Sequence, residues 1–314
     1  MSSNSRSNDA AFRSVILFFV LSYVISWGAA LVLHVIARQA GLAHFGSLMR
    51  MAESTFDLGS VADRLILPVP VVFVLTRIVD FGPTLAGLVT ASVVGGVAGF
   101  KRLGGQLLRW RVGVRWYLLA VFGPGLAMLI AIGLYALVDS SFLASANFIW
   151  PTIGRELLFW LFVRTMLGGG LGEELGWRGF ALPRLAAHYG PNRASLVIGI
   201  VWTFWHLPGH LIGASPVANL LAQLLVTIPG SYVATWLYLR TGGSVLILTL
   251  FHGALNGFNS FYERSLFPAL RDADAWLLIF IALLIGISIW ASTTMRGEWA
   301  RFSERTQGYG SSTF

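Results

Sequence analysis

The sequence predicts an all-α protein that lies in a lipid bilayer as a polytopic bundle of about eight transmembrane helices. Hydrophobic residues make up 56% of the 314 residues, charged residues make up only 11%, and the mean hydropathy is +0.72. An ordinary soluble domain carries roughly 25% charged residues. The composition therefore suits a protein surface that faces lipid, and the apolar runs are long enough to cross a hydrocarbon core of roughly 30 Å.

The expected helices lie near residues 15–37, 66–99, 116–138, 155–186, 194–210, 218–239, 243–260 and 274–294. The first run is too long for the apolar part of a signal peptide and lacks a small-residue cleavage site, so we expect it to be retained. The second run contains Pro68, Pro70 and Asp80. We therefore expect its span proper at 82–99 and an interfacial or half-spanning piece over 65–80.

The arginines predict the orientation of the bundle. Placing the N-terminus inside the cell puts most loop arginines on the inner side, including those within 101–115 and 296–305. Because basic residues favour cytoplasmic loops, we expect both termini in the cytoplasm. Of the 22 basic residues only Lys101 is a lysine, a bias typical of GC-rich genomes, so we expect an integral protein of a bacterial inner membrane.

No linker, low-complexity tract or repeat divides the chain, so we expect one membrane domain. Its parts are a cytoplasmic tail (1–14), N-terminal transmembrane helices (15–149), a motif-bearing core (150–260), and the last helix with a cytoplasmic tail (261–314). The net charge of +8 is spread over short loops, which argues against a nucleic-acid partner. The absence of cysteine excludes disulfides, thiolate metal sites and cysteine nucleophiles.

Polar side chains inside the apolar runs are the functional candidates, because an ionised side chain at the bilayer centre costs roughly 2.5–3.5 kcal/mol. Glu174 and Arg178 are four residues apart with the acid first, which predicts an ion pair across one helical turn. Glu173 points about 100° away from that pair, so we expect it to remain free unless Arg155 or Arg164 neutralises it. The full set is Glu156, Glu173, Glu174, Arg178, His206, His252 and Asn256.

Three expected helices carry these residues to a similar depth. His206 follows Trp202 by one turn, and His252 and Asn256 form a His-x-x-x-Asn pair on one helix face. At 1.5 Å per residue, Glu173 and these residues lie about 13–21 Å below the inner boundary. We therefore expect one polar pocket. The alternatives are a packing histidine and an interhelical polar clamp, which contributes about 1 kcal/mol.

Two chemistries fit such a pocket. Glu173 and His206 can deprotonate a water and pass the proton to a leaving amine, while His252 and Asn256 donate to the developing oxyanion. Alternatively, Glu173, His206 and His252 can bind a catalytic zinc ion, with the second glutamate as base. The cofactor is thus either zinc or none, and the residues alone leave both mechanisms open.

The motifs Glu-Glu-x-x-x-Arg at 173–178, aromatic-x-x-x-His at 202–206 and His-x-x-x-Asn at 252–256 resemble, in this order, those of the CPBP family of intramembrane proteases. That family includes CAAX prenyl endopeptidases and bacteriocin-processing or immunity proteins. The resemblance implies a catalytic core over 150–260. It further implies that Glu173 and His206 activate water, that His252 and Asn256 form the oxyanion hole, and that Glu174 and Arg178 support them.

One residue departs from the family pattern, because the second motif normally starts with phenylalanine and here starts with Trp202. We expect this difference to change the shape of the pocket. The family is commonly called a metalloprotease family, although a metal-free glutamate mechanism is also proposed for it.

The sequence therefore predicts an intramembrane endopeptidase that cleaves a membrane-anchored protein or peptide entering from the cytoplasmic side. A prenylated CAAX tail is the less expected substrate in a bacterium. The alternatives are a non-catalytic immunity or scaffold protein and a proton-coupled transporter, although no pair of repeated halves is evident. The expected partners are the substrate and the lipid bilayer, and the sequence leaves the oligomeric state open.

Overall fold

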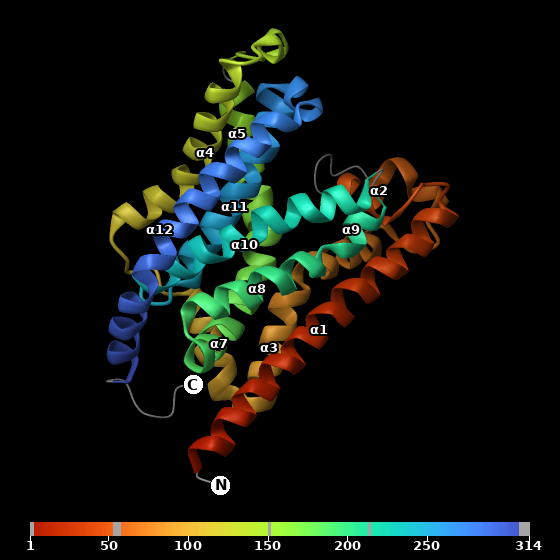
Figure 1. Cartoon of the computed structure of the whole chain (residues 1–314). Coiled ribbons are helices and arrows are strands. Elements are labelled where there is room, and N and C mark those ends of the chain that lie inside the picture. Colours follow the sequence, from red (N-terminus) through yellow and green to blue (C-terminus); the bar gives the residue numbers. More distant parts are fainter. Residues whose placement is uncertain (1–2, 53–57, 150–151, 213–214, 308–314) are drawn as a thin grey trace.

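The computed structural model describes residues 3–52, 58–149, 152–212 and 215–307, and within these residues the regular secondary structure is helical, with no strand. Five helices are long and apolar enough to cross a bilayer. They are α1 (Ser3–Gln39), α3 (Val69–Leu107), α4 (Val114–Ala136), α10 (Pro216–Arg240) and α12 (Asp274–Gln307). The prediction of a polytopic helical bundle is confirmed (Figure 1).

The three remaining predicted spans, which carry the polar motifs, are built from shorter helices. The shorter α-helices are α2 (Phe45–Arg50), α5 (Thr152–Met166), α6 (Gly169–Glu174), α7 (Leu182–Tyr189), α8 (Pro191–Trp205), α9 (Leu207–Leu211) and α11 (Val245–Phe261). Short 3₁₀ segments lie at Leu58–Arg64, Ser141–Ser145 and Pro268–Asp272. Two π-helical segments lie at Leu175–Ala181 and Tyr262–Leu266.

The prediction of one continuous helix over 155–186 is wrong, because the helix is interrupted between the end of α5 and the start of α6. Gly168 caps α6 in an extended conformation (φ −121°, ψ −148°), and glycine has a low helix propensity. Helix α3 supplies hydrogen-bond donors at the break. Arg77 donates through Nη1 to the Leu167 carbonyl, and Thr84 Oγ1 donates to the Leu171 carbonyl at 2.9 Å. Non-helical backbone at membrane depth is tolerated where protein groups satisfy it in this way.

Residues 69–80 of the expected interfacial or half-spanning piece belong to α3, which continues from them into the expected span at 82–99. Pro68 lies at the N-cap and Pro70 in the first turn, where proline costs no hydrogen bond. Arg77 and Asp80 neutralise each other at 3.2 Å. The real irregularity lies at Gly96, whose φ of 56° and ψ of −150° divide α3, a conformation that glycine tolerates and other residues rarely adopt.

The predicted helix 194–210 ends early as well, since α8 stops at Trp205 and the short α9 follows His206. Pro208 in the first turn of α9 lacks the N–H that would continue the α8 hydrogen-bond ladder. As a result His206 lies at the junction of two helices, where its side chain can face a cavity.

Helix α11 forms the centre of the bundle and packs against α4, α5 and α6. Helices α1 and α3 pack on each other at one side, and α10 and α12 do so at the other (Figure 1). The long helices expose large apolar side chains such as Leu31, Val93, Leu118 and Phe122, as expected for surfaces in contact with lipid. Helix α1 begins and α12 ends at the same end of the bundle (Figure 1).

Candidate active site

Two indole groups hold the carboxylate of Glu173. Trp177, one turn further along the chain, donates its Nε1–H to Glu173 Oε2 at 3.1 Å, and Trp202 of α8 donates to the same oxygen at 2.5 Å. Glu173 is only 3% exposed, so each of these hydrogen bonds forms away from bulk water. A buried carboxylate is costly unless donors surround it. The two indoles therefore stabilise the carboxylate and fix its orientation.

The neighbouring Glu174 contacts two basic side chains, and both contacts involve Oε1. Arg178 Nη1 donates to this atom at 2.8 Å, and His252 Nδ1 of α11 donates to it at 2.7 Å. Arg178 is 1% exposed and its guanidinium lies 4.7 Å from the centre of the Trp202 ring, a cation–π arrangement. The predicted Glu174–Arg178 ion pair is confirmed.

His252 lies between the two glutamates. While Nδ1 faces Glu174, Nε2 lies 4.0 Å from Glu173 Oε1, and the imidazole packs edge-on against Trp202 with ring centres 5.2 Å apart. The cluster contains two carboxylates and one guanidinium, so it is electrically neutral only when His252 is protonated. The protonation of His252 is therefore coupled to the ionisation of Glu173 and Glu174.

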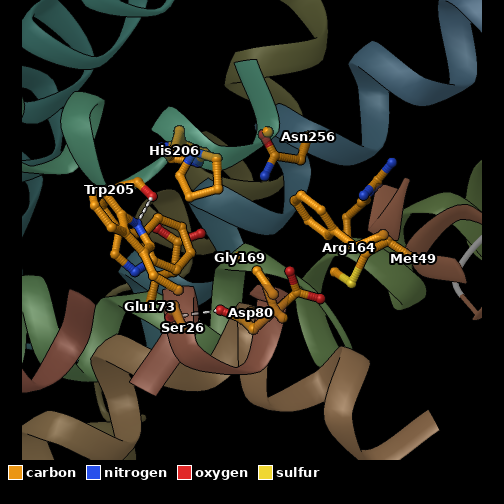
Figure 2. A pocket seen from close by; sticks show the side chains of 15 residues that line it. Ser26, Met49, Asp80, Arg164, Gly169, Glu173, Trp205, His206 and Asn256 are labelled. Carbon is orange, nitrogen blue, oxygen red and sulfur yellow. Dashed lines mark hydrogen bonds between the residues drawn. The ribbon is translucent and has the colours of Figure 1, made fainter. Parts of the chain in front are cut away.

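A cavity of about 260 Å³ adjoins this cluster. Glu173, His206 and Asn256 line it, and they come from α6, the α8–α9 junction and α11. Figure 2 shows the His206 and Asn256 side chains at this cavity, together with Asp80 of α3 and Arg164 of α5. The structure thus brings three of the four predicted site residues to one cavity.

His252 does not line the cavity with Asn256 as predicted. It is 4% exposed, its Nδ1 faces Glu174, and it is not among the residues that line the cavity. Glu173 is also not free, because both indoles donate to it. Glu156 lies apart from the site. It is paired with Arg155 at 3.6 Å and accepts a hydrogen bond from Ser265 at 3.2 Å.

The ring of His206 has a defined orientation and tautomer. Its Nδ1 lies 2.9 Å from the Trp202 carbonyl oxygen, and since a carbonyl only accepts, Nδ1 carries the proton. In the neutral ring Nε2 is then an acceptor. His206 can therefore take a proton from a molecule in the cavity.

Gly169 leaves room for the reactive side chains. A Cβ atom at this position would lie 2.6 Å from His252 Nε2 and 2.7 Å from Glu173 Oε1. Any side chain here would displace one or both groups, so the close approach requires glycine.

Four residues of the site were not predicted as functional groups from the sequence. Trp177 and Trp202 donate to Glu173, while Asp80 and Arg164 line the cavity. The spacing from Glu173 to Trp177 is i,i+4 and could have indicated their contact. The contacts of Trp202, Asp80 and Arg164 depend on helix packing, which one sequence does not disclose.

A zinc ion would need at least three ligands at metal distance. Among the described residues, no group of three or more histidine, aspartate and glutamate side chains is arranged to hold a metal ion. The Nδ1 atoms of His252 and His206 are engaged in hydrogen bonds, which leaves Nε2 of each ring able to bind a metal, so these two contacts do not argue against one. Within the part of the chain that the structure describes, Glu173, His206 and His252 are not grouped as a metal-ligand set.

The geometry defines a polytopic membrane protein with a buried cluster of acids and bases beside an internal cavity. Residues 155–258, which contain all three motifs, match the family described as Type II CAAX prenyl endopeptidase Rce1-like. CAAX prenyl protease 2 of Methanococcus maripaludis is 30% identical over 125 residues, which are 37% of this chain and 44% of the relative's length. The matched segment thus spans less than half of that relative, and both similarities agree with the resemblance to the CPBP family that the motifs indicate.

Proposed function

We propose that this chain is an intramembrane endopeptidase that hydrolyses a peptide bond of a membrane-anchored protein or peptide. The observation that carries the proposal is that Glu173, His206 and Asn256 line one cavity inside a helical membrane protein. A carboxylate and an imidazole that face the same small volume can share the protons of one water molecule. The similarity of residues 155–258 to the CAAX endopeptidases supports the same reaction class.

In the proposed reaction Glu173 is the general base. Its Oε2 accepts both indole hydrogen bonds, which leaves Oε1 to take a proton from a water in the cavity. The resulting hydroxide attacks the scissile carbonyl carbon. The proton on Glu173 then passes to Nε2 of His206, which delivers it to the nitrogen of the leaving amine as the C–N bond breaks, so both side chains return to their starting protonation states.

Asn256 supplies the oxyanion donor in this proposal, because its amide lines the cavity and an amide N–H group stabilises charge as it develops on the carbonyl oxygen. His252 is assigned a positioning role, since it contacts both glutamates and does not reach the cavity. Glu174 and Arg178 in turn fix the imidazole of His252. This assignment differs from the oxyanion role that the family resemblance implied for His252.

We further propose an inner-membrane location with both termini in the cytoplasm. Arg102, Arg109, Arg111 and Arg115 surround the α3–α4 connection, and Arg301 lies near the end of α12. Arginines near the ends of apolar helices favour the cytoplasmic side.

The proposal is tested with the full chain in proteoliposomes and a panel of quenched fluorescent peptides. One set carries a lipid anchor, including a prenylated peptide of the type in the name of the curated relative, and a matched set lacks the anchor. We expect cleavage of anchored peptides and much slower cleavage of the matched free peptides. Binding without cleavage across the panel would contradict the enzyme and favour a scaffold protein.

Adding a chelator in the same assay distinguishes the metal-free, glutamate-activated mechanism from the zinc mechanism. A glutamate-activated water predicts an unchanged cleavage rate after treatment with 1,10-phenanthroline and no stoichiometric metal in the purified protein. Loss of activity that zinc alone restores would contradict the metal-free mechanism and leave the endopeptidase proposal standing.

Replacing Gly169 with alanine should reduce the cleavage rate by about 100-fold, the order of loss that a misplacement of about 1 Å produces. The added methyl group would meet His252 Nε2 and Glu173 Oε1. Gly154 in α5 is the matched control, because a Cβ there has open space around it. Cleavage of the anchored peptide by the two variants is compared, and equal rates would show that the close approach at Gly169 is unimportant.

A further inference from the structure

A second, strongly basic pocket lies at the end of the bundle where α12 finishes, away from the candidate active site. It has a volume of about 230 Å³, and helices α4, α10 and α12 form it. Its lining includes three arginines and one acid, namely Arg115, Arg240, Arg301 and Glu298. The proposed proteolysis uses none of these residues.

The pocket carries an uncompensated positive charge. Glu298 is only 8% exposed, and its Oε1 accepts from Arg240 and from Arg301, each at 2.6 Å. One carboxylate thus serves two guanidinium groups. Arg115 adds a third positive charge, so three cations face one anion and the net charge of the pocket is about +2 at neutral pH.

Two of these cations share one aromatic ring. The guanidinium carbons of Arg115 and Arg240 lie 5.0 and 5.6 Å from the centre of the Trp116 ring. Both arginines also line the same pocket, so an anion bound in the pocket would be attracted to both charges. Each guanidinium also retains N–H donors beyond those used by Glu298, in a planar geometry that suits phosphate oxygens.

The surroundings of the pocket indicate a lipid. Arg115 lies in the first turn of α4 and Arg240 in the last turn of α10, at the ends of two apolar helices. Leu118, Leu119 and Phe122 follow Arg115 on the same face of α4 and are 54%, 41% and 55% exposed. A lipid whose phosphate binds at Arg115 could therefore lay an acyl chain along this exposed apolar stripe.

We propose that this pocket binds the phosphate of an anionic phospholipid headgroup, with the acyl chains along the exposed face of α4. Basic pockets between transmembrane helices bind such headgroups through charge and hydrogen bonds. Free phosphate shares the headgroup chemistry, but it would make no use of the apolar stripe. The proposal is independent of the proteolytic function.

The test uses the purified full chain in detergent micelles that contain phosphatidylglycerol or phosphatidylcholine, and native mass spectrometry measures the affinity of each bound lipid. We expect phosphatidylglycerol to bind more tightly than the zwitterionic phosphatidylcholine. The Arg115→Gln and Arg301→Gln substitutions should each weaken phosphatidylglycerol binding by roughly fivefold. Arg115→Lys keeps the charge but loses the planar donor geometry, so it should weaken binding less than Arg115→Gln does.

Arg111 provides the matched control. It is exposed at the same end and stacks on Trp110 at 5.2 Å, but it does not line the pocket, so Arg111→Gln should leave lipid binding unchanged. Equal affinity for the two lipids, or unchanged phosphatidylglycerol binding in the Arg115→Gln/Arg301→Gln variant, would overturn the proposal. Displacement of phosphatidylglycerol by an equal concentration of inorganic phosphate would assign the pocket to a free anion and overturn the lipid assignment.

Discussion

The Glu173→Gln substitution is expected to reduce the single-turnover rate of peptide cleavage by about a thousandfold, within the range that general bases contribute. Glutamine has the same size, and its amide oxygen can still accept from Trp177 and Trp202. The fold should therefore persist. Glutamine cannot take a proton from water, so only the proposed chemical step is lost.

Glu156→Gln is the matched control for this prediction. Glu156 lies in α5 of the same family-like segment, but it pairs with Arg155 and does not line the cavity. Its substitution should leave the cleavage rate close to that of the unsubstituted protein. A Glu173→Gln variant that cleaves the anchored peptide as fast as Glu156→Gln does would rule out Glu173 as the base.

Arg178→Ala is expected to lower the free energy of unfolding by about 3–5 kcal/mol, the cost of removing one partner of a buried ion pair. Glu174 is 1% exposed, so its charge would face only His252 after the substitution. The imidazole would lose its fixed position, and cleavage should fall as well. Thermal or denaturant unfolding of the purified protein in detergent measures the change.

Arg155→Ala is the control for Arg178, because Arg155 is 76% exposed and lies 3.6 Å from Glu156. Exposed pairs contribute about 0–1 kcal/mol, so the effect should be small. The double variant Glu174→Gln/Arg178→Ala should be less destabilised than Arg178→Ala alone, because the buried charge is removed with its partner. Equal destabilisation by Arg155→Ala and Arg178→Ala would show that burial of the pair does not govern its contribution.

The parts of the site that the sequence predicted correctly depend on local spacing. The Glu174–Arg178 pair follows from four residues on one helix. The common depth of Glu173, His206 and Asn256 follows from counting residues along three expected helices, and these residues do share one cavity. Where helical geometry alone sets the contact, one sequence is enough to predict it.

The errors arose where tertiary contacts override the local pattern. An apolar run in the sequence cannot show that the helix is interrupted near Gly168, because Arg77 and Thr84 of another helix donate to the carbonyls around that interruption. His252 and Asn256 share a helix face, yet Glu174 binds His252 and only Asn256 reaches the cavity. Helix packing decided both outcomes.

Trp202 illustrates both kinds of inference. Its difference from the phenylalanine usual in the family motif was evident from the sequence, and we expected it to alter the pocket shape. The structure instead gives its indole two contacts, as a hydrogen-bond donor to Glu173 and as the aromatic face beneath Arg178. The indole N–H therefore makes a hydrogen bond that phenylalanine could not make.

The central claim is that Glu173 activates a water molecule and does not itself attack the substrate. The most direct test is a single turnover of an anchored peptide in water enriched in oxygen-18, followed by mass spectrometry of the product and of the enzyme peptide that contains Glu173. The claim predicts one oxygen-18 atom in the new carboxyl group of the product and none in Glu173. Oxygen-18 in the Glu173 carboxylate would contradict it.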